Sequence, residues 1–310
     1  MALLLALACA AVSLGGDVLP GPGLLLVGSA LIGVPHGISD FIVARRLWGR
    51  SLGRAWLPAF VSGYLAVVVL VMVGWIAAPI GTLVVFLLVS SLHFGAGEGL
   101  APARSRWTVW ARAVTPVLPI FMFHPHEVGR VLAAMVGRPE SDVVQDLALL
   151  KLVAFWPWLV TVAAAATAAL ARVGRDGDEV WDATEIVALS LAAWLLPPFL
   201  TFALYFCLLH AVRHMVELAS EAHPTHPGRA LAYATRIILP CSALCTIALI
   251  CLWEQASGLS GAHALIARGL QLLAALTLPH MLLEAMVACS ARACASHRAA
   301  FGPQPFDETH

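Results

Sequence analysis

The feature that most constrains the fold of this chain is a succession of apolar stretches. Most of them approach the ~20 residues that a helix needs to cross the hydrocarbon core of a bilayer. They lie near residues 2–15, 22–44, 56–77, 79–97, 107–123, 146–170, 184–198, 199–220, 233–253 and 264–288. Charged residues make up only 12% of the 310 residues, against about 25% in ordinary soluble domains. We therefore expect an integral membrane protein.

The expected fold is all-α, a polytopic transmembrane helix bundle of about 8–10 spans that forms one integral-membrane domain over residues 1–310. Residues 1–16 are interpreted as a short first span and residues 290–310 as a cytoplasmic tail. Arginines indicate the sides, because cytoplasmic loops are enriched in Lys and Arg. The arginine-rich loops all fall on one side of a ten-span arrangement. This predicts a multi-pass protein of the inner (plasma) membrane with both termini in the cytoplasm.

Five histidines lie inside these apolar stretches: His36, His93, His210, His214 and His280. A polar, titratable ring in hydrocarbon costs free energy unless it is paired, hydrogen-bonded or bound to a metal. The predicted orientation places each histidine about 11–16 residues into a span that runs inward, a depth of about 17–24 Å at 1.5 Å per residue. Imidazole is a common transition-metal ligand, so this shared depth predicts an intramembrane polyhistidine metal site.

The most specific local motif is the H-x-x-x-H pair formed by His210 and His214. Residues i and i+4 share a helix face, so both rings can bind one metal. Glu217 follows three residues later and is a candidate to orient a ring by hydrogen bonding. The alternative is a pair of surface histidines near a helix end, and the apolar surroundings of the motif weaken it.

Two further stretches share a proline, a histidine and a carboxylate four residues after the histidine. Asp40 follows His36 in this way, and Glu284 follows His280. A ligating histidine usually donates its other ring nitrogen to a carboxylate or a carbonyl. We therefore expect Asp40 and Glu284 to orient histidines, with a simple helix-packing hydrogen bond as the alternative for His280.

His93 lies in a stretch of small residues and is followed by Glu98 five residues later. On a regular helix this spacing displaces the carboxylate from the histidine face by about 140°. The glycines between the two residues can unwind the turn and bring Glu98 back toward His93. Otherwise Glu98 is a solvated charge at the cytoplasmic end of the span.

Four separated motifs stand along the chain in the order V-P-H-G-I-S-D, S-S-L-H-F-G-A-G-E, L-L-H-A-V-R-H and L-P-H-M-L-L-E. In order and spacing they resemble the Brp/Blh family of membrane-bound β-carotene 15,15′-dioxygenases. The resemblance implies an iron-dependent enzyme that cleaves the central double bond of β-carotene with O₂ to give two molecules of retinal. It also implies that His36, His93, His210 and His214 ligate the iron, and it leaves the role of His280 open.

Fe(II) suits such a site, because neutral imidazoles leave its charge intact and four of them leave one or two positions open for O₂ and substrate. A lipid-dissolved polyene would enter sideways between helices, where aromatic side chains can line its path. The expected tunnel residues are Phe41, Phe94, Tyr205 and Phe206. Besides β-carotene and O₂, the expected partners are membrane lipids.

Other functions remain open from the residues alone. The five histidines and the carboxylates Asp40, Glu98, Glu217 and Glu284 could hold two irons, as in a dinuclear-iron membrane oxygenase acting on another isoprenoid or lipid. The same groups at one depth could form a path for protons or metal ions in a transporter, and facing histidines could ligate a haem. A net charge of zero gives no support to nucleic-acid binding.

Overall fold

The computed structural model describes residues 35–96, 105–174, 177–214 and 262–301, together with the single positions 228 and 232. Two predicted spans, 2–15 and 233–253, lie outside this part of the chain. The described elements are all helices, which confirms the all-α prediction. In chain order they are α3 (Pro35–Leu52), η2 (Gly53–Ala55), α4 (Trp56–Ala77), α5 (Pro79–Ala96), α6 (Arg106–Val114), α7 (Leu118–Phe123), α8 (Pro125–Val136), α9 (Glu140–Leu170), α10 (Gly177–Leu195), α11 (Pro198–Ala203), η3 (Leu204–Ala211) and α15 (Ala262–Phe301).

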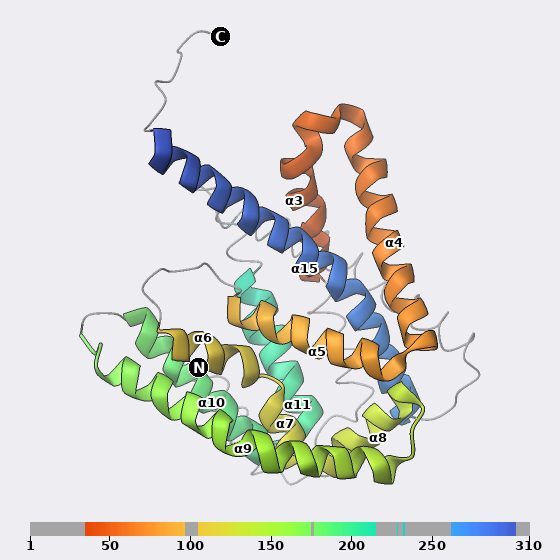
Figure 1. Ribbon diagram of the computed structural model, residues 1–310, viewed down its shortest axis with the longest axis vertical. Helices are drawn as coiled ribbons and strands as arrows, with labels where there is room; N and C mark the ends of the chain where they lie inside the picture. Colours follow the sequence, from red (N-terminus) through yellow and green to blue (C-terminus); the bar gives the residue numbers. More distant parts are fainter. Residues whose placement is uncertain are drawn as a thin grey trace.

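Three described segments are long and apolar enough to cross a membrane: Asp40–Ala77, Glu140–Leu170 and Ile266–Val287. Pro79–Gly95 is a shorter apolar helix. The first segment is a pair of helices, because the chain reverses between α3 and α4 (Figure 1). Gly53 lies at this reversal with a φ of +53°, a conformation that glycine adopts without steric cost. These segments identify a multi-pass membrane protein.

Proline explains where the helices depart from the hydropathy pattern. Helix α4 coincides with the predicted span 56–77, and α5 covers all but the last residue of the predicted span 79–97. The predicted span 107–123 is instead divided into α6 and α7. Pro116 lies in the turn between these two helices, and a proline inside a helix removes one hydrogen bond and clashes with the preceding turn.

Helices α9 and α10 begin six and seven residues before the spans predicted at 146–170 and 184–198. Both extra turns are acidic, with Glu140 and Asp142 in the first turn of α9 and Asp178 and Glu179 in that of α10. Carboxylates are stabilised at a helix N-terminus by the helix dipole. Hydropathy detects the apolar part of each helix and misses this charged beginning.

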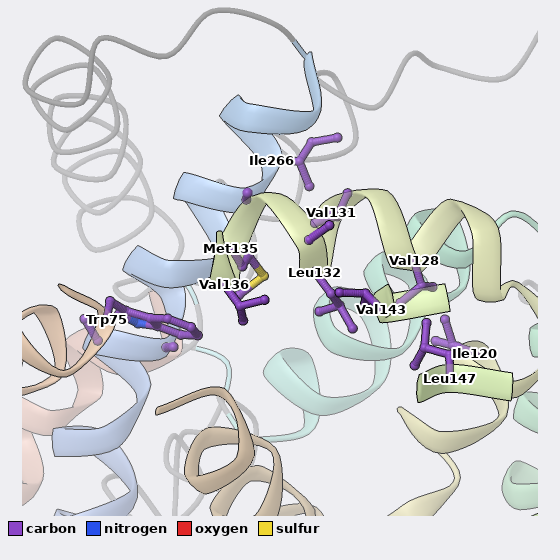
Figure 2. Packing of buried hydrophobic residues seen from close by; sticks show 14 of the residues in the cluster. Trp75, Ile120, Val128, Val131, Leu132, Met135, Val136, Val143, Leu147 and Ile266 are labelled. Atoms are coloured by element: carbon purple, nitrogen blue, oxygen red, sulfur yellow. The ribbon is translucent and has the colours of Figure 1, made fainter. Parts of the chain in front are cut away.

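Helix α15 packs against helices from separate parts of the sequence. It runs diagonally past the α3–α4 pair in Figure 1 and packs against α3, α4, α5 and α8. Trp75 of α4, Met135 and Val136 of α8, and Ile266 of α15 belong to one buried apolar cluster (Figure 2). The core therefore holds α15 along much of its length, and the residues that α15 carries are fixed relative to α4, α5 and α8.

The chain between α10 and residue 214 changes its winding twice. Helix α10 ends at Leu195 and α11 begins at Pro198, which agrees with the boundary predicted between the spans 184–198 and 199–220. Residues Leu204–Ala211 then form η3, a π-helix. π-Helical turns are rare and occur frequently at functional sites. His210 lies in this turn, and regular helix resumes at Val212.

Candidate metal centre

Helices that are far apart in the sequence bring four of the five predicted histidines together. His93 comes from α5, His210 from η3, His214 from the turn that follows η3, and His280 from α15. The ring centroids of His93 and His280 are 5.6 Å apart, and those of His214 and His280 are 5.3 Å apart. The rings therefore form one cluster, as a shared metal requires.

Glu284, one turn after His280 on α15, lies at the centre of this cluster. Its Oε2 is 3.1 Å from Nδ1 of His93, and its Oε1 is 3.2 Å from Nδ1 of His214. The same Oε1 is 3.6 Å from Nε2 of His280. One carboxylate thus contacts three imidazoles from three segments of the chain. The sequence spacing predicted its pairing with His280 and gave no signal for the other two contacts.

His93 and His210 approach each other through their Nε2 atoms, which are 3.4 Å apart. Two imidazole nitrogens that each lie about 2.1 Å from one metal ion are about 3.0–3.4 Å from each other, for angles at the metal between about 90° and 109°. The ring of His210 is held by neighbouring aromatic rings, with centroids 5.2 Å from Phe94 and 5.8 Å from Phe206. The separation of the two nitrogens therefore fits a shared ion.

Asp40 orients His280 from another helix. Its Oδ1 is 2.6 Å from Nδ1 of His280, and both side chains are buried. This hydrogen bond directs the other ring nitrogen of His280 toward Glu284, as outer carboxylates do for ligating histidines. Tyr64 interacts electrostatically with Asp40 and donates its hydroxyl to the carbonyl of Leu276 at 2.9 Å. Asp40 therefore pairs with a histidine of another helix, a contact that the local spacing did not predict. Its predicted pairing with His36 involves a side chain outside the described ones.

The donor set fits a divalent transition metal. One ligand atom from each of His93, His280 and Glu284 lies within 4.8 Å of the other two, and the nitrogens of His210 and His214 lie beside them. Imidazole nitrogens suit Fe(II) and other divalent transition metals, and a carboxylate such as Glu284 can join them as a ligand or orient their rings. The cluster also lies among apolar helices, where a bound ion would be shielded from bulk water.

An apolar pocket adjoins the cluster. Phe94 and Phe206, whose rings contact His210, line this pocket, as do Phe199 and Phe202. Side chains of α5, α7, α8, α11 and α15 form the remaining wall, and they are almost all hydrocarbon. The pocket can therefore hold a hydrocarbon chain with one part against the histidines.

The other predicted tunnel residues occupy different places. Tyr205 is buried and packs on Phe94 at a ring distance of 5.2 Å, and it lies behind the pocket wall. Phe41 is 40% exposed and packs on Trp56 on the outer side of α3, so it does not line this pocket.

Three predicted site residues lie wholly or partly outside the described residues. The backbone of His36 belongs to α3, but its side chain is not described. Glu98 and Glu217 fall outside the described residues altogether. Sequence reasoning also missed Tyr64, which has no motif that would connect it with the distant Asp40.

Comparisons with known proteins agree with the motif resemblance. Residues 27–288 match the protein family described as beta-carotene 15,15′-dioxygenase. A beta-carotene 15,15′-dioxygenase from an uncultured marine bacterium, 66A03, is 26% identical over 256 residues, which cover 81% of this chain and 88% of the relative. A probable beta-carotene 15,15′-dioxygenase Blh from Halobacterium salinarum is 28% identical over 287 residues, or 83% of this chain and 81% of the relative. No solved structure shows a significant match to the chain.

Proposed function

The chain belongs to the β-carotene 15,15′-dioxygenase family, and from this membership we propose that its histidine cluster holds a ferrous ion beside which β-carotene is split. The protein is an oxidoreductase that incorporates O₂, and the reaction of its family converts β-carotene to retinal. Family membership selects an enzyme over the transporter that the histidines alone left open. We propose the identity of the metal, its ligands and the position of the substrate.

The proposed ligands are His36, His93, His210 and His214. The Nε2 separation of His93 and His210 supports two of them, and the contact of His214 with Glu284 supports a third. Bound iron would supply the electrons that O₂ needs to react with a closed-shell olefin. Glu284 would orient imidazoles from three segments toward the ion. The hydrogen-bonded pair of Asp40 and His280 would in turn position Glu284.

The apolar pocket supports a hydrocarbon substrate. Phe94 and Phe206 form the part of its wall that contacts His210, so a polyene in the pocket has one of its double bonds next to the cluster. The apolar wall would exclude water and confine the polyene. Holding the polyene in a near-attack geometry beside the cluster would lower the barrier. β-Carotene and O₂ are both apolar and would reach the pocket through the surrounding lipid. The proposed location is the inner membrane, with both termini in the cytoplasm.

The observation that carries the proposal is the convergence of His93, His214 and His280 on Glu284, with His210 against His93, beside an apolar pocket. The test is expression in β-carotene-accumulating cells with product analysis, and iron measurement on the purified protein. We expect loss of pigment, formation of retinal and bound iron. Replacement of His210 by alanine should abolish both iron binding and turnover. The exposed His126 of α8 provides the matched control, and His126→Ala should change neither. Unchanged pigment with iron bound would remove the substrate assignment.

One contact pattern favours a second arrangement, a dinuclear iron site. The two oxygens of Glu284 face different histidines, Oε2 toward His93 and Oε1 toward His214 and His280. Glu284 and the surrounding histidines would then hold two irons in place of one. The iron content distinguishes the alternatives, with about one iron per chain for the mononuclear site and about two for the dinuclear one.

A further inference from the structure

Helix α10 carries three acidic residues at intervals of three, Glu179, Asp182 and Glu185. Residues three apart are neighbours on a helix surface, so the three carboxylates form a stripe along one side of α10. All three are buried, with exposures of 0%, 5% and 8%. A buried carboxylate is costly in free energy unless a hydrogen-bond donor or a cation accompanies it. The partners of these three carboxylates therefore identify the segments of the chain that they hold in place.

The first two acids bind helix α6 and the residue that precedes it. Glu179 accepts hydrogen bonds from the backbone N–H of Ser105 and the hydroxyl of Thr108, and Arg172 lies 3.0 Å from it. Asp182 forms an ion pair with Arg112 of α6. Helix α6 contributes no residue to the histidine cluster. These contacts therefore fasten one helix to another and have no direct relation to the metal centre.

The third acid reaches the cluster. Glu185 forms a 2.6 Å ion pair with Arg213, which stands three residues after His210 and one before His214. One turn further along α10, Leu189 packs with Tyr205 and Phe206 on the other side of His210. Helix α10 thus contacts this segment on both sides of His210.

We propose that Glu185 and Arg213 are positioning residues, whose ion pair fixes the rotation of the segment that carries His210 and His214. The inference rests on the proposed function, since it assumes that these histidines bind the metal. A helix turns about 100° per residue, so a small rotation about its axis moves both rings away from their partners. With Arg213 held by Glu185, the ring of His210 faces His93 while that of His214 faces Glu284.

The π-helical winding of η3 makes an external anchor necessary. A π-turn is less favourable than regular helix and is maintained by its surroundings. Its last residue, Ala211, is two positions before Arg213, and regular helix resumes between them. The ion pair is thus placed where the chain returns to α-helical geometry, and its loss would remove one of the contacts that fix the orientation of both histidines.

The experiment compares variants of the full chain in detergent. Arg213→Met keeps much of the side-chain volume and removes the charge, Arg213→Lys keeps the charge, and Glu185→Gln removes the other partner. The exposed ion pair of Arg130 with Glu140, whose side chains are each 48% exposed, provides the matched control Arg130→Met. The measurements are Fe(II) affinity, the electron paramagnetic resonance spectrum of the nitric oxide adduct at full iron loading, thermal unfolding, and kcat and KM for retinal formation.

We expect Arg213→Met and Glu185→Gln each to weaken Fe(II) binding by about 10- to 100-fold, the range typical of residues that orient metal ligands. The adduct spectrum and kcat should change, with KM changing less. The double variant should lose no more than the single variants, because both remove one interaction. Arg213→Lys should recover most of the affinity, and Arg130→Met should match the wild type.

Wild-type iron affinity and an unchanged adduct spectrum in Arg213→Met would overturn the inference. A lowered unfolding temperature with normal iron binding would also overturn it, because the pair would then be structural only. If Arg213→Met does not accumulate, Glu185→Gln decides, because it removes the same ion pair. A changed adduct spectrum with weaker iron binding would support the proposal, and a wild-type spectrum with wild-type affinity would overturn it. A wild-type protein that binds iron but leaves β-carotene intact would refute the proposed substrate and leave this test valid.

Discussion

Two clusters of titratable side chains among the described residues differ in how their charges are paired. Along α10 three buried carboxylates each contact an arginine, namely Arg172, Arg112 and Arg213. In the candidate metal centre Glu284 contacts the rings of three histidines, and Asp40 contacts one of these rings. Each carboxylate of α10 therefore contacts a permanent cation, whereas the candidate metal centre brings together ligand atoms that can bind a metal cation.

This contrast predicts the largest effect on stability at the carboxylates of α10. Arg112→Met leaves Asp182 buried beside an apolar side chain, and breaking a buried pair costs about 3–5 kcal/mol. Thermal unfolding in detergent, followed by circular dichroism, measures the loss. The folded fraction should retain wild-type iron content and kcat. Arg130→Met breaks an exposed pair and should cost under about 1 kcal/mol. Equal losses in the two variants would show that the α10 stripe is not a special source of stability.

The metal centre should respond in the opposite way. Glu284→Gln keeps the shape of the side chain but removes the charge that three imidazoles share. Iron affinity and kcat should fall by at least about 100-fold, the upper end of the range for residues that orient ligands. The unfolding temperature of the iron-free protein should change little. Glu179→Gln on α10 is the matched variant and should lower stability while its folded fraction stays active. The comparison fails if Glu284→Gln turns over at the wild-type rate.

A smaller effect is expected one step further from the ion. Asp40→Asn retains an oxygen that can accept the hydrogen bond of His280 but lacks the charge that strengthens it. Iron affinity should fall by about tenfold, the lower end of the range for such carboxylates. Metal competition titration measures the affinity. Asp142→Asn, an exposed position on α9, should leave the affinity unchanged, and the same small loss at both positions would remove the role of Asp40.

The smallest effect concerns the apolar pocket. Leu273→Val removes one methylene from its wall on α15, and a buried methylene is worth about 0.8 kcal/mol. KM for β-carotene should rise about fourfold with kcat nearly unchanged, as measured by retinal formation. Leu152 of α9 is 74% exposed, so Leu152→Val should have no effect. An identical change in both variants would indicate that the substrate lies elsewhere.

Hydropathy and proline positions predicted those helices whose ends are determined by the local sequence. The apolar run that ends at Ala77 and the one that begins at Pro79 coincide with α4 and α5, because proline and the ends of apolar runs act within one turn of the chain. The acidic first turn of α10 was missed, since its charges are stabilised by the helix dipole and by contacts with α6 that hydropathy does not measure.

The sequence predicted which residues form the candidate site but not how their side chains are arranged. His93, His210, His214 and His280 were recognised from their apolar surroundings, and they do come together. The partners of these rings depend on how α3, α5 and α15 pack. The pairing of Asp40 with His280 joins residues 240 positions apart, and no local spacing contains that information. The same holds for Glu284, whose contacts with His93 and His214 exist only in the folded bundle.

Helix α15 contributes to both the pocket wall and the histidine cluster. Leu270, Leu273 and Thr277 line the pocket, and His280 follows Pro279 on the same helix. At 1.5 Å per residue, Leu270 and His280 are about 15 Å apart along its axis. With the proposed substrate in this pocket, that distance along one helix would set how far from the end of the polyene the scission occurs.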